Sequence, residues 1–472
     1  MGIEESKDMS ALLLIVPLAA VLILNLPLSF LRKCVIPFGV AFSIMQAMAV
    51  LFWANELAAP SVLPLAVDSL TRVMLLAIAL VVASALLVGR GTIEDEIKRC
   101  NFANLVLLAL VGMNGVVLCA DLFSIYVFIE IAAVSSFILI ASDKSRAGFE
   151  GAFKYFVLSA AASIAILTGV ALLLLVSGST KFAEVASVIG SAGGQPFVLL
   201  ALALFIGGLF IKSGLVPFHG WVPDAYSSAP SAVSVLLAGI VTKTTGVYVL
   251  LRLVMDVLGF SMALRDIMML VGALTLAGAA LAALVQTNFK RMLAYSSISQ
   301  VGYIILSFGV ATPLGIAGAV FHLFNHAVFK SLLFVNAAAV EKKTGTCDMN
   351  EMGGLAARMP MTGFTSVVGL LSTAGVPPLA GFWSKLVIIL ALWQAGHYAY
   401  ATIAVLFSLV TLAYFLAMQR KVFFGLLRPN CEKASEAFEL AVPTILLAAI
   451  TIAVGLLIPF IKGTFLLPIN GF

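Results

Sequence analysis

Seven ionisable side chains stand inside long apolar stretches of this sequence, where a charge is costly. They are Glu130, Lys212, Lys243, His322, His326, Lys330 and Lys385. A charge near the centre of a bilayer costs at least about 2.5–3.5 kcal/mol, and such residues usually line ion pathways. Carboxylate, ammonium and imidazole groups can pass protons from one to the next. The simpler alternatives are that a long lysine reaches the headgroups, or that the carboxylate only joins two helices.

Glu130 and Lys212 have the most informative surroundings. Glu130 lies in the middle of LFSIYVFIEIAAVSSFILIA, and a buried carboxylate needs a cation or a proton. Lys212 precedes a break in its apolar stretch, made by Gly214, Pro217 and Pro223. Interrupted helices are tolerated where they line a cavity, and they often mark ion sites. The sequence therefore predicts a protonation switch at Lys212.

A second break lies beside Lys385. The segment STAGVPPLAGFWSKLVII contains Gly375, Pro377, Pro378 and Gly381 just before the lysine. Two interrupted stretches in one chain are the best sequence indication of repeated halves with a site near the middle of the membrane. The two breaks fall in the seventh and the twelfth of the apolar spans that are given below. They are therefore five spans apart, which is an odd number. The repeats must therefore have opposite orientations, which predicts an inverted repeat.

His322, His326 and Lys330 occur as FHLFNHAVFKS, at positions i, i+4 and i+8. This spacing stacks them on one face of a helix. Histidine is the group that titrates closest to neutral pH, so the stripe predicts a proton relay. A metal site with two histidines is the alternative, but neither a carboxylate nor a third ligand accompanies them in this span.

Three further groups complete the candidate pathway. Lys243 lies in the middle of LLAGIVTKTTGVYVLL, where the flanking threonines can hydrogen-bond it. His219 and Asp224 follow the first break in a segment that we interpret as a loop, and they are candidates for a cytoplasmic entrance. The alternative for these two is that they are ordinary solvated loop residues.

Cofactor chemistry has no recognisable motif here. The five cysteines, Cys34, Cys100, Cys119, Cys347 and Cys431, are far apart and form no CxxC or Cys/His pattern. The chain also lacks a glycine-rich phosphate loop and a nucleophile elbow. We therefore expect no metal and no cofactor in this chain.

The composition explains what must position these groups. Of the 472 residues, 62% are hydrophobic and 10% are charged, whereas soluble domains carry about 25% charged residues. The apolar runs are long and do not alternate, which favours an all-α membrane protein over a barrel. We predict fourteen spans, at 11–31, 35–54, 67–88, 102–120, 121–141, 154–176, 197–215, 231–252, 267–286, 292–311, 313–340, 360–394, 400–420 and 437–461.

Lysine and arginine test this count, because cytoplasmic loops are enriched in them. With both termini outside, seventeen of the 27 basic residues fall in inward loops and six fall outside. The four that remain are Lys212, Lys243, Lys330 and Lys385, all within spans. We therefore expect a multi-pass protein of the cell membrane, with both termini outside.

The repeats divide the chain into four parts. We expect three N-terminal helices in 1–100 and a first five-helix repeat, helices 4–8, in 101–255. A second five-helix repeat, helices 9–13, follows in 256–425, and a last helix lies in 426–472. Helices 7 and 12 are the interrupted ones.

Four segments together closely resemble one family. They are VFIEIA, LFIKSGLVPFHGWVPDAYSSAPSAVSVLLAGIVTKTTGVY, FNHAVFKSLLF and GVPPLAGFWSK. They resemble the antiporter-like subunits of complex I, the large subunits of Mrp-type sodium/proton antiporters, and the corresponding subunits of membrane-bound energy-converting hydrogenases. The resemblance covers about residues 60–425.

The resemblance implies roles for individual residues. It implies that Glu130 pairs with Lys212 and that Lys243 is the central lysine of the eighth helix. His322, His326 and Lys330 match the histidine and lysine positions of the eleventh helix. Lys385 matches the outlet position of the twelfth, where some members carry glutamate. In the family, the protonation of this line alternates with the state of the Glu–Lys pair.

The main hypothesis is a proton-translocating subunit of a redox-driven complex, of complex I or [NiFe] hydrogenase type. Its expected partners are a further antiporter-like subunit and a redox module. The alternative is a subunit of an Mrp-type Na⁺/H⁺ antiporter without a redox partner. A module for inorganic-carbon transport and a structural scaffold are further alternatives, although a scaffold would gain stability by losing its buried charges. The end at Phe472, shortly after the last span, favours the shorter members of these families.

Overall fold

Helices, joined by short turns and loops, make up the part of the protein that the computed structural model describes, residues 9–26, 29–52, 67–192 and 194–465. Its few β-type contacts there are isolated bridges, Asp121 with Lys181 and Asn288 with Asp348. The all-α membrane fold predicted from composition is therefore confirmed.

The chain forms two compact units that are not continuous in sequence. The first unit comprises residues 1–86, 93–214 and 240–261, and the second comprises 87–92, 215–239 and 262–472. Residues 215–239 thus belong to the second unit, although the segments on either side of them belong to the first.

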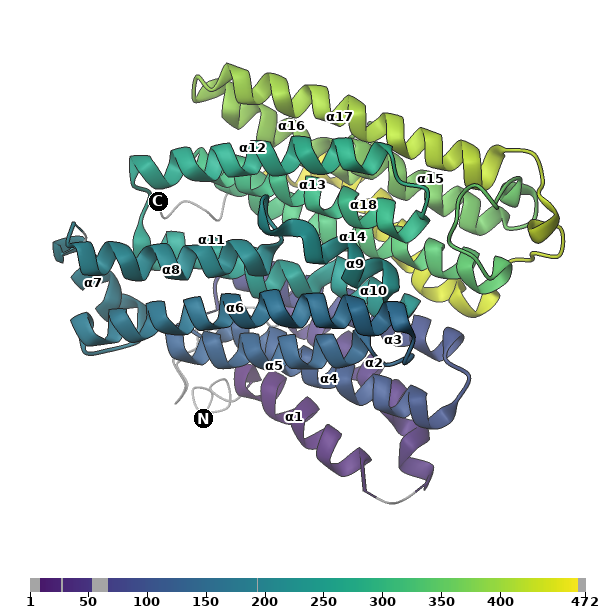
Figure 1. Ribbon diagram of the computed structural model, residues 1–472, viewed down its shortest axis with the longest axis horizontal. Coiled ribbons are helices and arrows are strands. Elements are labelled where there is room, and N and C mark those ends of the chain that lie inside the picture. Colours follow the sequence, from purple (N-terminus) through teal and green to yellow (C-terminus); the bar gives the residue numbers. More distant parts are fainter. Residues whose placement is uncertain (1–8, 27–28, 53–66, 193, 466–472) are drawn as a thin grey trace. The chain divides into compact units, whose positions relative to one another are not determined.

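The helices of the first unit begin with α1 (Met9–Leu24), α2 (Ser29–Phe52) and α3 (Ser69–Thr92), whose last turn belongs to the second unit. They continue with α4 (Glu96–Leu118), α5 (Leu122–Ile140), α6 (Arg146–Ser177), α7 (Phe182–Ala192), α8 (Pro196–Ser213), η5 (Lys243–Tyr248), α11 (Val249–Leu253) and η6 (Val254–Leu258). Within this unit α4 packs on α5, and α6 packs on α8 (Figure 1).

The second unit starts with η3 (Phe218–Gly220), α9 (Trp221–Ser228) and α10 (Ser231–Leu236), and η4 (Leu237–Val241) leads back to the first unit. The later helices are α12 (Met262–Leu284), α13 (Phe289–Gly309), α14 (Pro313–Thr344), η7 (Leu355–Ala357), α15 (Pro360–Ala374), α16 (Ala380–Gln394), α17 (Tyr398–Gln419), η8 (Arg420–Phe424), η9 (Pro429–Cys431), η10 (Phe438–Leu440) and α18 (Ala441–Phe465). Helix α14 packs against α13, α15, α16 and α18.

Twelve helical stretches in the described residues are long and apolar enough to cross a membrane. Helix α1 has 16 residues, and the predicted twelfth span consists of two 15-residue helices, α15 and α16. The chain is therefore a multi-pass membrane protein, while the count of fourteen spans and the inverted repeat stay predictions. Helix α7, an 11-residue element, was not predicted.

Both predicted helix breaks are present. Helix α8 ends at Ser213, where Gly214 adopts φ = 66°, and α15 ends at Ala374, where Gly375 adopts φ = 85°. Left-handed backbone of this kind suits glycine, which lacks a Cβ. The prolines that follow cannot donate a backbone hydrogen bond to continue either helix.

The eighth predicted span differs from a regular α-helix. It includes two π-helical segments, η4 and η5, and a third, η6, follows beyond its predicted end at residue 252. Such segments are rare and often occur at functional sites. One of them, η5, approaches the end of α8 closely, because a Cβ on Gly246 would lie 2.5 Å from the backbone nitrogen of Ser213. The segment that carries Lys243 thus packs closely against the end of α8, the helix that carries Lys212.

Candidate functional site

Glu130 and Lys212 meet in the first unit. The Lys212 Nζ lies 3.1 Å from Glu130 Oε1, and 2% of the lysine side chain is exposed against 31% of the glutamate. Helix α5 supplies the carboxylate and α8 supplies the lysine. The two groups are thus in hydrogen-bonding contact, with the lysine deep and the carboxylate at the edge of the unit.

Two serines of α6, which the sequence reasoning missed, complete this pair. The Lys212 Nζ donates to Ser159 Oγ at 2.7 Å, and Ser163 Oγ donates to Glu130 Oε1 at 2.5 Å. Their i, i+4 spacing puts both hydroxyls on one face of α6. That spacing is visible in the sequence, but nothing in the sequence says which helix the face meets.

The two breaks give Lys212 and Lys385 a similar environment. Lys212 lies in the last turn of α8, where the helix dipole favours a cation. Lys385 follows its break in sequence, but its Nζ reaches back to the carbonyl oxygen of Ala374, 3.4 Å away, at the end of α15. Both lysines thus lie at a helix break, Lys212 in the last turn before it and Lys385 through its contact with the carbonyl at the end of α15.

Lys385 belongs to a buried cluster in the second unit. Its Nζ lies 4.4 Å from the centre of the Tyr303 ring, and that ring lies 5.9 Å from the His322 ring. The His322 Nδ1 is 2.8 Å from Ser384 Oγ, next to Lys385 in sequence. The His322 Nε2 has no hydrogen-bond partner among the described residues. The cluster can therefore take a further proton-carrying partner, such as water, on that side.

The predicted stripe on α14 is buried along its whole length. His322, His326 and Lys330 are each 0% exposed. The Lys330 Nζ donates to Ser296 Oγ at 2.6 Å and lies 5.3 Å from the centre of the Phe415 ring. Eight residues of helix separate the ends of the stripe, which is about 12 Å. The stripe thus extends over a distance too long for direct contact between its first and last side chains. Ser296 lies at the Lys330 end.

Lys243 is also buried, at 1% exposure. The hydroxyls of Thr244 and Thr245 donate to carbonyl oxygens of their own helix, those of Ile240 and Val241. Because a lysine ammonium only donates, the hydroxyl oxygens can still accept from Lys243, and the expected contact stays a prediction.

His219 and Asp224 lie in helical structure, so their description as loop residues was wrong. His219 is in η3 and its ring lies 6.5 Å from the Tyr295 ring. Asp224 is in α9 and forms an ion pair with Arg291 of α13. The aspartate thus holds α9 to its own unit, and the two candidate residues face the same helix, α13.

A second ionic cluster near these residues was also not predicted from the sequence. The Lys290 Nζ lies 2.8 Å from Glu341 Oε2 and donates to the Ala229 carbonyl at 3.1 Å. Ser231 Oγ donates to the same carboxylate. Lys290 had been counted as a loop residue, but it is 2% exposed.

Arg252 was likewise counted with the loops, and it is 4% exposed. Its guanidinium binds Asp68 through two nitrogens, at 2.6 and 2.8 Å, and Asp256 at 3.1 Å. Burial raises the pKa of the Asp68 carboxyl, but its bonds and attraction to Arg252 outweigh burial and lower that pKa from 3.8 to about 2. This cluster joins α3 to α11 and η6.

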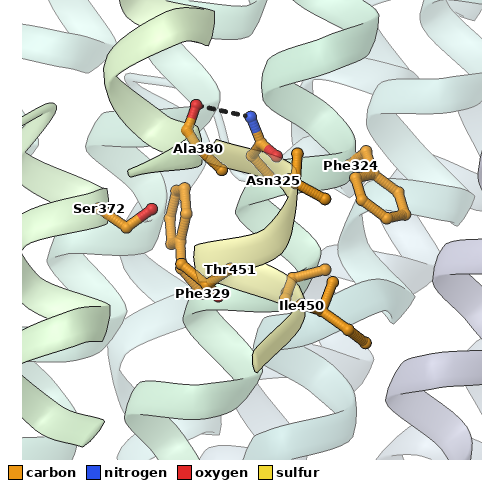
Figure 2. A pocket seen from close by; sticks show the side chains of 9 residues that line it. Phe324, Asn325, Phe329, Ser372, Ala380, Ile450 and Thr451 are labelled. Carbon is orange, nitrogen blue, oxygen red and sulfur yellow. Dashed lines mark hydrogen bonds between the residues drawn. The ribbon is translucent and has the colours of Figure 1, made fainter. Parts of the chain in front are cut away.

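A small cavity borders the α15–α16 break (Figure 2). Its lining includes Asn325 of α14, Ser372 of α15 and Thr451 of α18. The Asn325 amide donates to the Ala380 carbonyl at 3.1 Å, as the dashed line in Figure 2 shows. The asparagine therefore fixes the first turn of α16, the helix that carries Lys385. No group of three or more His, Cys, Asp or Glu side chains in the described ranges is placed to hold a metal ion.

Comparison with known proteins identifies the family. Residues 119–411 match the family described as NADH:quinone oxidoreductase/Mrp antiporter, transmembrane. The chain is 32% identical to an Na(+)/H(+) antiporter subunit of Alkalihalophilus pseudofirmus, over 84% of this chain and 81% of the relative. It is 31% identical to NADH-quinone oxidoreductase subunit N of Desulforudis audaxviator, over 93% and 92%.

A solved structure agrees with these relatives. The fold resembles a chain of the membrane-bound sulfane sulfur reductase, an archaeal respiratory membrane complex, with a TM-score of 0.86. The two chains are 30% identical, and the match covers 98% of this chain and 96% of that one. This chain belongs to the NADH:quinone oxidoreductase/Mrp antiporter transmembrane family.

Proposed function

We propose that this chain is the proton-translocating, antiporter-like subunit of a redox-driven multisubunit membrane complex. Its partners are then a further antiporter-like subunit and a redox module, and the chain itself carries no redox cofactor. The contact that supports this most is the one between Glu130 and Lys212, because a buried lysine held by one carboxylate can change its protonation when the carboxylate moves or is neutralised.

The first unit supplies the switch in this proposal. With the pair closed, Glu130 stabilises the Lys212 ammonium together with Ser159. When the pair opens, the ammonium loses its counter-charge in a desolvated place and gives up its proton. Lys243 is the next acceptor. His219 and Asp224 are the candidate entrance.

The second unit supplies the relay and the outlet. His322, His326 and Lys330 form the stripe along α14, and Lys385 lies at the helix break beside Tyr303. Histidine can accept a proton on one ring nitrogen and release one from the other, which suits a relay. Lys385 is the release group. Both termini of the chain lie outside the cell in this proposal.

The test is a Glu130→Gln variant of the intact complex, reconstituted in vesicles and followed with a pH-sensitive dye during electron transfer. We expect proton translocation to fall at least tenfold, since glutamine removes the charge but keeps the shape. Glu150→Gln is the matched control, because Glu150 is exposed and its ion pair within the described residues is with its helix neighbour Lys154. Normal proton uptake by Glu130→Gln vesicles would exclude the pair as the switch.

A second candidate is a subunit of an Mrp-type Na⁺/H⁺ antiporter, and the similarity to an Na(+)/H(+) antiporter subunit over 84% of this chain favours it. Mass spectrometry of the intact complex, extracted through a tag on this chain, separates the two. Iron–sulfur or quinone-reductase-like partners support the redox complex. Small hydrophobic partners without a metalloprotein support the antiporter.

A further inference from the structure

A groove of about 1230 Å³ opens on the first unit, away from the ionisable pathway. Four helices form it, through the end of α1, the first half of α4, the end of α5 and the start of α6. Neither Glu130 nor Lys212 lines it. Nothing in the proposed proton pathway uses this groove, so its shape and polarity need another explanation.

The length of the groove matches one leaflet of a bilayer. Along α4 it extends from Asp95 to Leu108. Thirteen residues of helix span about 20 Å. Half of a bilayer, with about 15 Å of hydrocarbon and the headgroup region above it, measures roughly the same.

The end of the groove that we align with the headgroup region is charged. Asp95, Lys98 and Lys144 line it there, and both lysines are exposed. Neither lysine forms an ion pair with another described residue. Lys144 has φ = 58°, a conformation that glycine or asparagine adopts more readily than lysine does. Two cations and one anion at this end complement a zwitterion with a phosphate and an ammonium group.

The walls of the groove are apolar. Ile138, Phe153 and Phe156 line it and are 43%, 66% and 48% exposed. Leu105 and Leu108 continue this lining along α4. Large exposed side chains of this kind are suited to contact acyl chains.

One polar atom in the lining has no partner. The Asn104 side chain is 7% exposed, and its Oδ1 accepts no hydrogen bond from the described residues. Its Nδ2 is engaged with Asn25. This oxygen is itself closed off from solvent, so neither a headgroup nor water in the groove reaches it, and it does not decide the occupant.

We propose that this groove binds one phospholipid of the phosphatidylethanolamine type. Lys98 and Lys144 hold the phosphate, and Asp95 accepts hydrogen bonds from the ammonium. The acyl chains lie along Phe153, Phe156 and Leu108. An apolar helix of a partner subunit fits the groove less well, because it would leave both lysines without partners.

The test uses the purified whole complex, stripped of lipid in detergent and titrated with phosphatidylethanolamine in native mass spectrometry. We expect the Lys98→Gln, Lys144→Asn double variant to retain one lipid fewer per copy of this chain, with at least tenfold weaker binding of that lipid. Asparagine suits the backbone at position 144, so this variant should fold. Lys181→Gln with Lys433→Gln is the charge-matched control, since both lysines are exposed and outside the groove.

Headgroup selectivity gives an independent readout. Phosphatidylcholine with the same acyl chains carries the phosphate but no N–H donor, so we expect it to bind at least tenfold more weakly. Equal binding of the two lipids, or an unchanged lipid count in the double variant, would overturn the proposal. A photoreactive side chain at Phe153 that captures a protein segment in place of lipid would also overturn it, in favour of a partner helix.

Discussion

At the scale of single residues, the candidate site depends on small hydroxyl groups as much as on charges. Ser159 accepts from Lys212, Ser163 donates to Glu130, and Ser296 accepts from Lys330. A hydrogen bond to a charged group contributes about 1.5–3 kcal/mol. These serines therefore set how firmly each proton is held.

Ser159→Ala should weaken the hold on the Lys212 ammonium while keeping its ion pair. We expect coupled proton translocation in vesicles to fall about tenfold and its pH dependence to change, since about 1.4 kcal/mol corresponds to a factor of ten. Ser177→Ala is the control, because that hydroxyl donates to carbonyls at the far end of the same helix. Identical pH profiles for Ser159→Ala and wild type would show that the serine has no part in the switch.

Asp68 gives a prediction about pH. Its pKa in the folded protein is about 2, below the ordinary 3.8, so its bond to Arg252 stabilises the fold fully above pH 4. That contribution is lost as the pH falls through 2. The wild-type protein should melt at a higher temperature than Asp68→Asn at pH 6, and the gap should shrink between pH 4 and pH 2. The aspartate side chain is 47% exposed, so solvent screens the effect. A gap that is constant over this range would argue against the ionic bond.

At the scale of helices, the arrangement that recurs is a lysine at the carboxyl end of a half-helix. The helix dipole favours a cation at such an end, and the Lys385 ammonium also contacts the Ala374 carbonyl there. The breaks at Gly214 and Gly375 create these ends, and the sequence predicted both. What the sequence did not predict is that Lys385 turns back toward α15.

Gly246→Ala tests the close contact between η5 and the end of α8. The added methyl would lie 2.5 Å from the Ser213 backbone, so one element must move. We expect a loss of about 1–3 kcal/mol in stability and a reduced proton translocation, because Lys212 precedes Ser213. Gly207→Ala on α8 is the control, since nothing lies within 4 Å of the position that its methyl would take. Equal melting temperatures for the two variants would contradict the contact.

Hydropathy predicted that the seven candidate pathway residues lie in apolar helices but not the direction that each one faces. The all-α fold, the two breaks and this apolar setting could be predicted from composition and spacing. The burial of Lys290 and Arg252 could not be predicted, because each residue lies near the end of a span, where its neighbours can be either water or protein. The partner serines were missed for a related reason, since apolar helices carry no periodic polar face that fixes their rotation.

At the scale of the whole molecule, the segment 215–239 is tied to the second unit by ionic contacts. Asp224 pairs with Arg291, and Lys290 pairs with Glu341, which also accepts from Ser231. These contacts hold α9 and α10 against α13 and α14. The second unit is thus held together by these ionic contacts in addition to its apolar packing.

Glu341→Gln should destabilise the second unit, because it leaves the Lys290 ammonium buried without its counter-charge. The glutamate is 35% exposed, so we expect about 1–3 kcal/mol, less than for a fully buried pair. The double variant Lys290→Met, Glu341→Gln should recover part of this loss in a thermal melt of the purified protein. A double variant that is less stable than Glu341→Gln alone would show that Lys290 acts through its carbonyl contact and not through the pair.

The interleaved order of the two units also bears on how the protein is made. When the ribosome has synthesised residues 215–239, only residues 87–92 of the rest of their unit exist, because 262–472 have not yet been made. Domains fold as units during synthesis, so the first unit is complete only after residue 261. The ionic contacts of α9 and α10 form later still, because Arg291, which pairs with Asp224, and Glu341, which accepts from Ser231, come after residue 261 in the chain. The segment 215–239 can therefore complete these contacts only after α12, α13 and most of α14 have been synthesised.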